Sequence, residues 1–114
     1  MNNKKLVIDI EESIETKRSL LLIEDKIHNA IQIISKKLSK GGKVLLCGNG
    51  GSAADAQHLA AEFLIRLNPK INRRPLPAIS LATDISTILA CGNDFSFTKV
   101  FSRNLEALGK KNDI

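Results

Sequence analysis

Four residues in a mostly apolar stretch have side-chain types and a spacing that suit catalysis or metal binding: Asp55, His58, Glu62 and Arg66. If residues 53–66 form a helix, with about 100° between successive residues, these four side chains fall within one narrow stripe. His58 and Glu62 are four residues apart, close enough to share a metal ion. The same spacing would pair a carboxylate base with a neighbouring proton carrier. The pattern therefore predicts either a metal site or an acid/base site.

The rest of this stretch consists almost entirely of Ala, Leu, Phe and Ile. A helix with so much apolar surface is expected to be largely buried, so its polar stripe either reaches the surface or lines a polar cleft. In the first case, the stripe would be a narrow solvent-exposed face of the helix, stabilised by pairs such as Glu62 with Arg66. In the second case the stripe would be a functional site. The spacing alone leaves both interpretations open.

Three of the seven glycines lie directly before this helix, in the stretch Gly48-Asn49-Gly50-Gly51-Ser52. Glycines here let the backbone turn sharply and let a ligand approach the main chain. The stretch is neither GxGxxG nor GxxxxGK[ST], so we expect no nucleotide cofactor. Ser52 and Asp55 fit a capping-box pattern, which predicts a Ser52 hydroxyl that caps the helix. Alternatively, the exposed amides and the positive helix end would receive an anion or a sugar hydroxyl.

Two short apolar runs, 44–47 and 77–81, predict strands that are buried on both faces of a parallel sheet. With the helix between them they make a βαβ unit, which is right-handed in nearly all proteins. The predicted fold class is therefore α/β. After the second strand we expect a short segment at 85–90, a break at 91–94 and a helix over about 98–108.

The N-terminal part of the chain has a helical pattern. Apolar residues recur every three or four positions from Ile23 to Leu38, which predicts a helix that ends at the glycines that follow. A less regular helix is expected over about 10–22, and the two form either one long bent helix or a hairpin. We therefore expect a helical region at 1–40 and an α/β region at 41–114, within one domain overall.

The composition is that of a globular protein, with 43% apolar and 25% charged residues. No run approaches the ~20 apolar residues that span a bilayer, and the N-terminus lacks a signal-peptide pattern, so we expect a cytoplasmic protein without a membrane partner. The two cysteines, Cys47 and Cys91, lack CxxC spacing and are expected to be buried free thiols. A net charge of +5 favours an anionic partner. Few aromatic residues are present to stack on nucleic acid, so phosphorylated small molecules fit better.

Three blocks, in this order and spacing, closely resemble the phosphoheptose isomerases of the sugar isomerase (SIS) family: GGKVLLCGNGGSAADAQHLAAEF, RRPLPAISLATDIS and GNDFSFTKVFSRNLEALG. The resemblance runs from about residue 41 onward, and the preceding part matches only as a helical lead-in. It implies an incomplete SIS-type α/β fold, a βαβ sandwich with a parallel sheet, preceded by N-terminal helices. These enzymes interconvert sedoheptulose 7-phosphate and D-glycero-D-manno-heptose 7-phosphate, a step towards bacterial heptose and lipopolysaccharide.

The resemblance implies a role for each residue that matches the family motifs. Glu62 would be the catalytic base that moves a proton between C1 and C2 through an enediolate. His58 and Glu62 would together hold the zinc ion that some family members carry. Arg66 would orient Glu62 or contact the substrate. The other implied substrate contacts come from the glycine stretch and from a second loop: Asn49, Gly50, Gly51, Ser52, Asn93 and Asp94.

The resemblance also implies partners. Family members are tetramers whose active sites include residues of neighbouring subunits, so we expect a homo-oligomer, specifically a tetramer. The expected substrate is a sugar phosphate, and no nucleic-acid partner is expected. We expect the chain to be the N-terminal part of a longer protein, because another strand should follow its last turn. The remainder would carry a Ser/Thr-rich phosphate loop and a histidine that acts as partner acid/base. Alone, the chain is expected to be poorly active, and oligomeric or aggregation-prone.

Two other functions compete with the enzyme. Some SIS relatives are non-catalytic binding proteins, including a replication-initiator-associating protein that lacks the catalytic glutamate. Glu62 and the glycine stretch are both present here, which favours the enzyme. An inactive truncated fragment is the second alternative. A sugar-phosphate-sensing regulator would need a DNA-binding domain, and no helix-turn-helix pattern precedes the SIS blocks.

Overall fold

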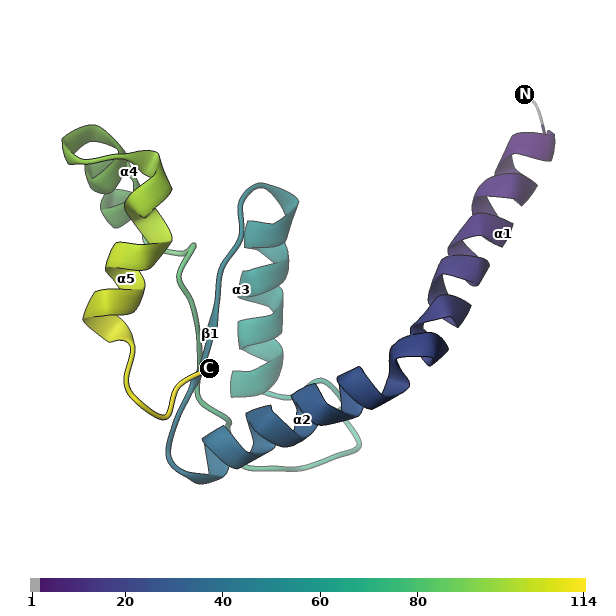
Figure 1. Cartoon of the computed structure of the whole chain (residues 1–114), viewed down its shortest axis with the longest axis horizontal. Helices are drawn as coiled ribbons and strands as arrows, with labels where there is room; N and C mark the ends of the chain where they lie inside the picture. Colours follow the sequence, from purple (N-terminus) through teal and green to yellow (C-terminus); the bar gives the residue numbers. More distant parts are fainter. Residues whose placement is uncertain (1–2) are drawn as a thin grey trace. The chain divides into compact units, whose positions relative to one another are not determined.

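The structure is a computed structural model that describes residues 3–114. It divides into two compact units, one up to Ile33 and one from Ile34 onward. Among the described residues, no helix combines the length and apolar character needed to span a bilayer. The elements shown in Figure 1 are, in order, α1 (Asn3–Ser19), the 3-10 helix η1 (Leu20–Ile23), α2 (Glu24–Ser39), β1 (Val44–Leu46), α3 (Gly51–Leu64), β2 (Ala78–Ser80), α4 (Ile85–Asp94), the 3-10 helix η2 (Phe97–Lys99) and α5 (Val100–Leu108).

The first unit is helical. The two predicted N-terminal helices are joined through η1 as one interrupted run, not as a hairpin. α1 begins earlier than expected, at Asn3, and α2 ends at Ser39, which confirms the predicted stop before the glycines. Large apolar side chains are exposed along this unit: Leu6, Val7, Ile8, Ile10, Leu20, Leu21, Leu22, Ile27 and Ile31. Their exposure leaves a long apolar surface on α1, η1 and α2.

The second unit is built on a parallel pair of strands. Val44 in β1 lies opposite Ala78 in β2, and Leu46 lies opposite Ser80. α3 connects the two strands, which confirms the predicted βαβ unit and the α/β class.

The expected burial on both faces of the sheet is wrong for residues 3–114, because Ile79 in β2 is 38% exposed and Leu45 and Leu46 in β1 are only half-buried. Of the two cysteines, Cys91 is buried as expected, whereas Cys47 is exposed.

Ile114 lies along the other edge of β1. Its amide donates to the Lys43 carbonyl at 3.1 Å, and its carbonyl accepts from the Leu45 amide at 2.7 Å. This alternation is the hydrogen-bond pattern of parallel strands.

The core of this unit is small and lies between the end of α2, the sheet and α3. Its buried residues are Leu38, Val44, Ala60 and Ala78, and Ile34, Leu46, Phe63 and Leu76 pack against them. Within α3 only Ala56 and Ala60 are buried, so the expectation of a largely buried helix is wrong for the described part of the chain. The reason is that the two-stranded sheet covers one face of α3 and leaves Leu59 and Leu64 exposed.

The predicted break at 91–94 is also wrong, because these residues form the last turn of α4. Asp84 caps the start of this helix, since its carboxylate accepts from the amides of Ser86 at 3.0 Å and Thr87 at 3.3 Å. Gly92 lies inside the helix without ending it, at a typical cost of about 1 kcal/mol relative to alanine. The helix expected over 98–108 is present as η2 followed by α5.

A polar contact ties the segment after α5 to the start of β1. The Asp113 carboxylate accepts from the Lys43 ammonium at 2.5 Å, and from the amides of Lys43 at 2.9 Å and Lys110 at 2.7 Å. The Lys43 ammonium also donates to the Leu108 carbonyl at 2.9 Å. The hydrogen bond from the Lys43 side chain is the largest cause that lowers the pKa of Asp113, to about 2. This carboxylate is therefore ionised at neutral pH.

Candidate active site

The glycine loop, Gly48 to Ser52, joins the carboxyl end of β1 to α3 (Figure 1). Gly50 has φ 56° and ψ −124°, a conformation that essentially only glycine adopts, and it is the N-cap of α3. The helix begins at Gly51, so Ser52 lies inside its first turn. The prediction that Ser52 caps the helix is therefore wrong, and no side-chain hydrogen bond caps this end.

Close packing explains another glycine of this loop. A Cβ atom at Gly48 would lie 2.6 Å from both the Cβ and the carbonyl oxygen of Ser52, so the strand end passes against the first turn of α3. The Ser52 amide closes the loop by donating to the Asn49 carbonyl at 3.0 Å. Asn49, Gly50, Gly51 and Ser52 are all exposed. These predicted substrate contacts lie together at the carboxyl end of β1, where α/β proteins commonly bind ligands.

His58 and Glu62 lie one turn apart on α3, and the structure brings them together as their spacing predicted. His58 Nε2 is 3.1 Å from Glu62 Oε1. The Glu62 side chain is 24% exposed and the His58 side chain 72% exposed. A partly buried carboxylate beside an imidazole has the arrangement that general acid/base chemistry requires.

This pair borders a hollow of about 320 Å³, which is within the size range of small-molecule pockets. Its walls are mostly apolar, and its ionisable groups are those of His58, Glu62 and Arg73. The full lining is His58, Leu59, Glu62, Phe63, Leu67, Arg73 and Leu76. The hollow can therefore accept a small molecule next to the Glu62 carboxylate, the His58 imidazole and the Arg73 guanidinium.

Arg66 does not belong to this group. α3 ends at Leu64, and the non-helical backbone of Ile65 (φ −102°, ψ −84°) turns the chain away. The exposed Arg66 guanidinium donates to the Pro69 carbonyl at 3.2 Å. The predicted stripe therefore ends at Glu62, whose ion-pair partner within residues 3–114 is His58 and not Arg66.

Arg73 is the residue near Glu62 that the sequence did not single out. Its Nη2 donates to the carbonyl of Glu62 at 2.6 Å, and its Nη1 donates to the carbonyl of Phe63 at 2.9 Å. In the sequence Arg73 is one member of a basic cluster. No local pattern indicates that this member, eleven residues after Glu62, folds back onto α3.

Asn93 and Asp94 were predicted to lie in a second loop, but they lie in the last turn of α4. Both are exposed, and Asn93 Nδ2 donates to Asp94 Oδ1 at 2.8 Å. Within the described part of the chain, no hydrogen bond or ion pair connects them to the glycine loop or to Glu62. Their role as substrate contacts stays a prediction.

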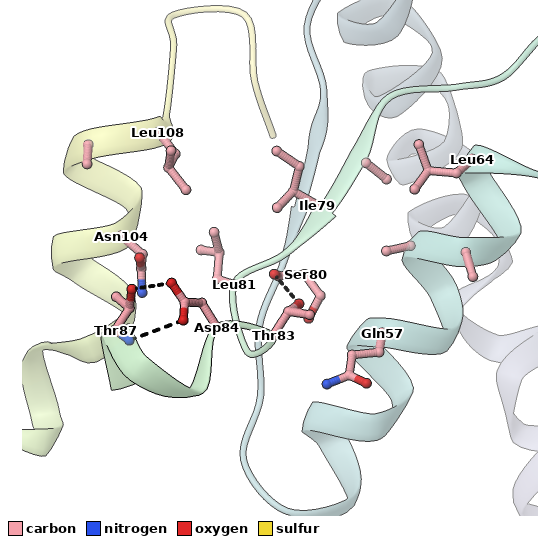
Figure 2. Close-up of a pocket in the computed structure, with 14 residues that line it drawn as sticks. Gln57, Leu64, Ile79, Ser80, Leu81, Thr83, Asp84, Thr87, Asn104 and Leu108 are labelled. Atoms are coloured by element: carbon pink, nitrogen blue, oxygen red, sulfur yellow. Dashed lines mark hydrogen bonds between the residues drawn. The ribbon is translucent and has the colours of Figure 1, made fainter. Parts of the chain in front are cut away.

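A larger hollow of about 690 Å³ lies between α3, β2, the start of α4 and α5 (Figure 2). Its polar groups largely satisfy one another: the Asp84 carboxylate accepts from the Thr87 amide and hydroxyl, and the Thr83 hydroxyl donates to the Ser80 carbonyl at 2.7 Å. The hydrogen bonds from Thr87 lower the pKa of Asp84. No His, Lys, Arg, Glu or Cys lines this hollow, so the His58–Glu62 side of α3 is the better candidate site.

The donors of His58 and Glu62 are of the types that zinc accepts. Their 3.1 Å separation is similar to the roughly 3.3 Å between two ligand atoms of a tetrahedral zinc ion with ~2.0 Å bonds. A zinc site takes three or four protein ligands. Over residues 3–114 no group of three or more His, Cys, Asp or Glu side chains is placed to hold a metal ion. The pair therefore fits part of a zinc site, and its other ligands would come from outside these residues.

Comparisons with known proteins show which family the chain belongs to. Residues 10–114 match the SIS domain family. The phosphoheptose isomerase of Desulfovibrio desulfuricans is 59% identical over 81 residues, which are 71% of this chain and 38% of that protein. The phosphoheptose isomerase of Helicobacter pylori is 44% identical over 111 residues, which are 97% of this chain and 56% of that protein. The chain thus spans about half the length of the curated relatives it matches.

Solved structures show the same fold. The phosphoheptose isomerase GmhA of Neisseria gonorrhoeae has a TM-score of 0.84 at 36% identity, over 99% of this chain and 58% of that one. A phosphoheptose isomerase from Francisella tularensis has a TM-score of 0.88 at 36% identity, over 99% of this chain and 59% of that one. These matches confirm the resemblance and the SIS-type α/β fold that it implied. The chain belongs to the SIS domain family, and the relatives it resembles are phosphoheptose isomerases.

Proposed function

We propose that the intact protein is an aldose–ketose isomerase that converts sedoheptulose 7-phosphate to D-glycero-D-manno-heptose 7-phosphate, for bacterial heptose and lipopolysaccharide biosynthesis. The observation that carries this proposal is the Glu62 carboxylate, which is 24% exposed, lies 3.1 Å from His58 and borders a hollow of small-molecule size. The named relatives support the substrate class, since they are phosphoheptose isomerases.

In the proposed reaction, Glu62 is the base. Its carboxylate takes a proton from C1 of the ketose, and the C1–H electron pair forms an enediolate with negative charge on O2. The protonated Glu62 then returns the proton to C2, which forms the C2–H bond of the aldose, while a proton passes from O1 to O2. That second transfer needs another acid/base group, which we expect outside this chain. A positioned base typically contributes about 10²- to 10⁴-fold.

The glycine loop is proposed to bind the sugar through Asn49, Gly50, Gly51 and Ser52. Their exposure at the carboxyl end of β1 supports this role, because the positive end of the α3 dipole lies there and favours bound anions. Asn93 and Asp94 are proposed as further contacts that a larger assembly would bring to the sugar. Arg66, which is exposed in the segment after α3, is proposed to attract the phosphate at long range.

Zinc is the proposed cofactor, and His58 and Glu62 would supply two of its ligands. The donor types and the 3.1 Å separation support this, while the remaining ligands would come from residues outside the described chain. A bound zinc ion would act as a Lewis acid that polarises a substrate oxygen. Positioning of the substrate and transfer of the carbon-bound proton remain with Glu62 and the glycine loop.

The protein is proposed to assemble as a homo-oligomer, specifically a tetramer, and to be located in the cytoplasm. The support is the apolar surface of the N-terminal helices, where Leu22 is 88% exposed and Leu21 is 72% exposed. Contiguous apolar surface of this kind commonly marks a protein–protein contact. The only other partner proposed is the sugar phosphate.

Replacement of Glu62 tests the catalytic assignment. In the intact protein, Glu62→Gln keeps the shape of the side chain but removes the base, so conversion of sedoheptulose 7-phosphate should fall by at least about 10²-fold. Glu106→Gln is the matched control, because Glu106 is an exposed carboxylate on α5, away from the His58–Glu62 pair. Turnover by Glu62→Gln equal to that of Glu106→Gln would refute the assignment.

A further inference from the structure

The loop that follows α3 bonds back to the last turn of that helix. The Arg73 guanidinium donates to the carbonyls of Glu62 at 2.6 Å and Phe63 at 2.9 Å, and we call these two bonds the Arg73 clamp. The Leu76 amide adds a third bond, to the Phe63 carbonyl at 3.0 Å. The last carbonyls of a helix lack intrahelical donors, and a cation is favoured at that end by the helix dipole. The clamp therefore stabilises the end of α3.

The shorter bond of the clamp goes to the residue that carries the proposed base. Arg73 is half-buried, and its side chain lines the same 320 Å³ hollow as Glu62 and His58. A planar guanidinium that bonds to two adjacent carbonyls has little freedom to move, so it fixes the main chain beneath Glu62. Lys70, in the same loop, is exposed, and its ammonium makes no hydrogen bond or ion pair within residues 3–114.

We propose that Arg73 is a positioning residue, which acts through Glu62 by fixing the backbone of the proposed base relative to the hollow. This inference rests on the proposed function and adds to it a role for Arg73, the first residue of the RRPLPAISLATDIS block, to which the resemblance assigned no role. It predicts a loss in the chemical step more than in substrate binding, because misplacing a base by a fraction of an ångström weakens proton transfer without removing a substrate contact.

The test compares three variants of the intact protein: Arg73→Gln, Arg73→Lys and Lys70→Gln. We expect Arg73→Gln to lower kcat about tenfold, equivalent to about 1.4 kcal/mol, with KM changed less than about twofold. Arg73→Lys should lose less, because an ammonium keeps the charge but cannot span two carbonyls as a fork. Lys70→Gln removes the same charge from the same loop and should leave kcat and KM unchanged.

Three results would overturn the inference. A higher KM at unchanged kcat in Arg73→Gln would mean that Arg73 binds the substrate directly. Equal losses in Arg73→Gln and Lys70→Gln would mean that only the loop charge matters. If Arg73→Gln does not fold, Arg73→Lys decides the question, and a kcat equal to that of Lys70→Gln would overturn the inference.

Hydrogen exchange separates failure of the clamp from failure of the proposed function. If the wild-type protein does not isomerise the sugar phosphate, the proposed function is refuted, whereas the clamp is judged from exchange of the amides in the last turn of α3. The Ile65 amide, bonded to the Ala61 carbonyl at 2.8 Å, reports on this turn. Faster exchange in Arg73→Gln than in Lys70→Gln supports the clamp, and equal exchange overturns it.

Discussion

Alanine substitutions at three glycines of the loop between β1 and α3 should differ in their effect on stability, and the structure gives the order. Gly50→Ala places a side chain at φ 56°, which costs about 1–2 kcal/mol although the space around it is open. Gly48→Ala places a Cβ 2.6 Å from Ser52, and the shift needed to relieve it costs about 1–3 kcal/mol. Gly51→Ala meets nothing within 4 Å and lies in a helix, so it should be neutral or stabilise by up to about 1 kcal/mol.

Urea unfolding of the intact protein, followed by circular dichroism, measures these free energies of unfolding. Gly51→Ala is the matched control, because it makes the same chemical change in the same loop without strain or a clash. We expect Gly48→Ala and Gly50→Ala to unfold at lower urea concentration than wild type, and Gly51→Ala at the same or a higher concentration. Equal destabilisation by all three variants, or none at Gly50→Ala, would refute the reasoning from loop geometry.

Three further predictions concern metal, pH and assembly. His58→Ala should reduce the zinc bound by the purified intact protein, measured by mass spectrometry of the metal; equal zinc contents would contradict the proposed ligand. The pKa of Asp113 is lowered to about 2, so its contribution to stability is present above its unfolded pKa near 3.8 and is lost as the pH falls through about 2. The amount by which the Tm of Asp113→Asn lies below that of the wild type should therefore shrink as the pH is lowered from about 5 to about 2. A Tm difference that stays constant over this range would contradict the Lys43 contact. Leu22→Asp should lower the oligomer mass in sedimentation, whereas an unchanged mass would exclude that surface from the assembly.

Local signals were enough to predict most of the fold. The apolar runs at 44–47 and 77–81 correctly predicted β1 and β2, because short continuous apolar segments are typical of parallel strands. They did not predict how little of the sheet is covered, since Ile79 is exposed. The break at 91–94 was wrong because a single glycine inside a helix is tolerated, and α4 runs on through Gly92 to Asp94. The burial of α3 was wrong because the small sheet leaves most of that helix uncovered. The periodicity of the α3 segment does not show how much of it a neighbouring sheet will cover.

The candidate site shows the same division between local and non-local information. The His58–Glu62 pair was predictable, because a four-residue spacing on a helix fixes its geometry. The separation of Arg66 was not, since the end of α3 at Leu64 has no glycine or proline beside it to mark it. The contact from Arg73 depends on how the loop after α3 folds back, which no spacing rule describes.

Proton transfer by Glu62 is tested most directly by isomerisation of sedoheptulose 7-phosphate in D₂O, with deuterium in the product located by NMR. Transfer through a carboxylate that exchanges with solvent predicts deuterium at C2 of the heptose 7-phosphate made by the wild-type intact protein. The same mechanism predicts that Glu62→Gln makes almost no product. Heptose 7-phosphate formed by Glu62→Gln at the wild-type rate would contradict the proposed role of Glu62.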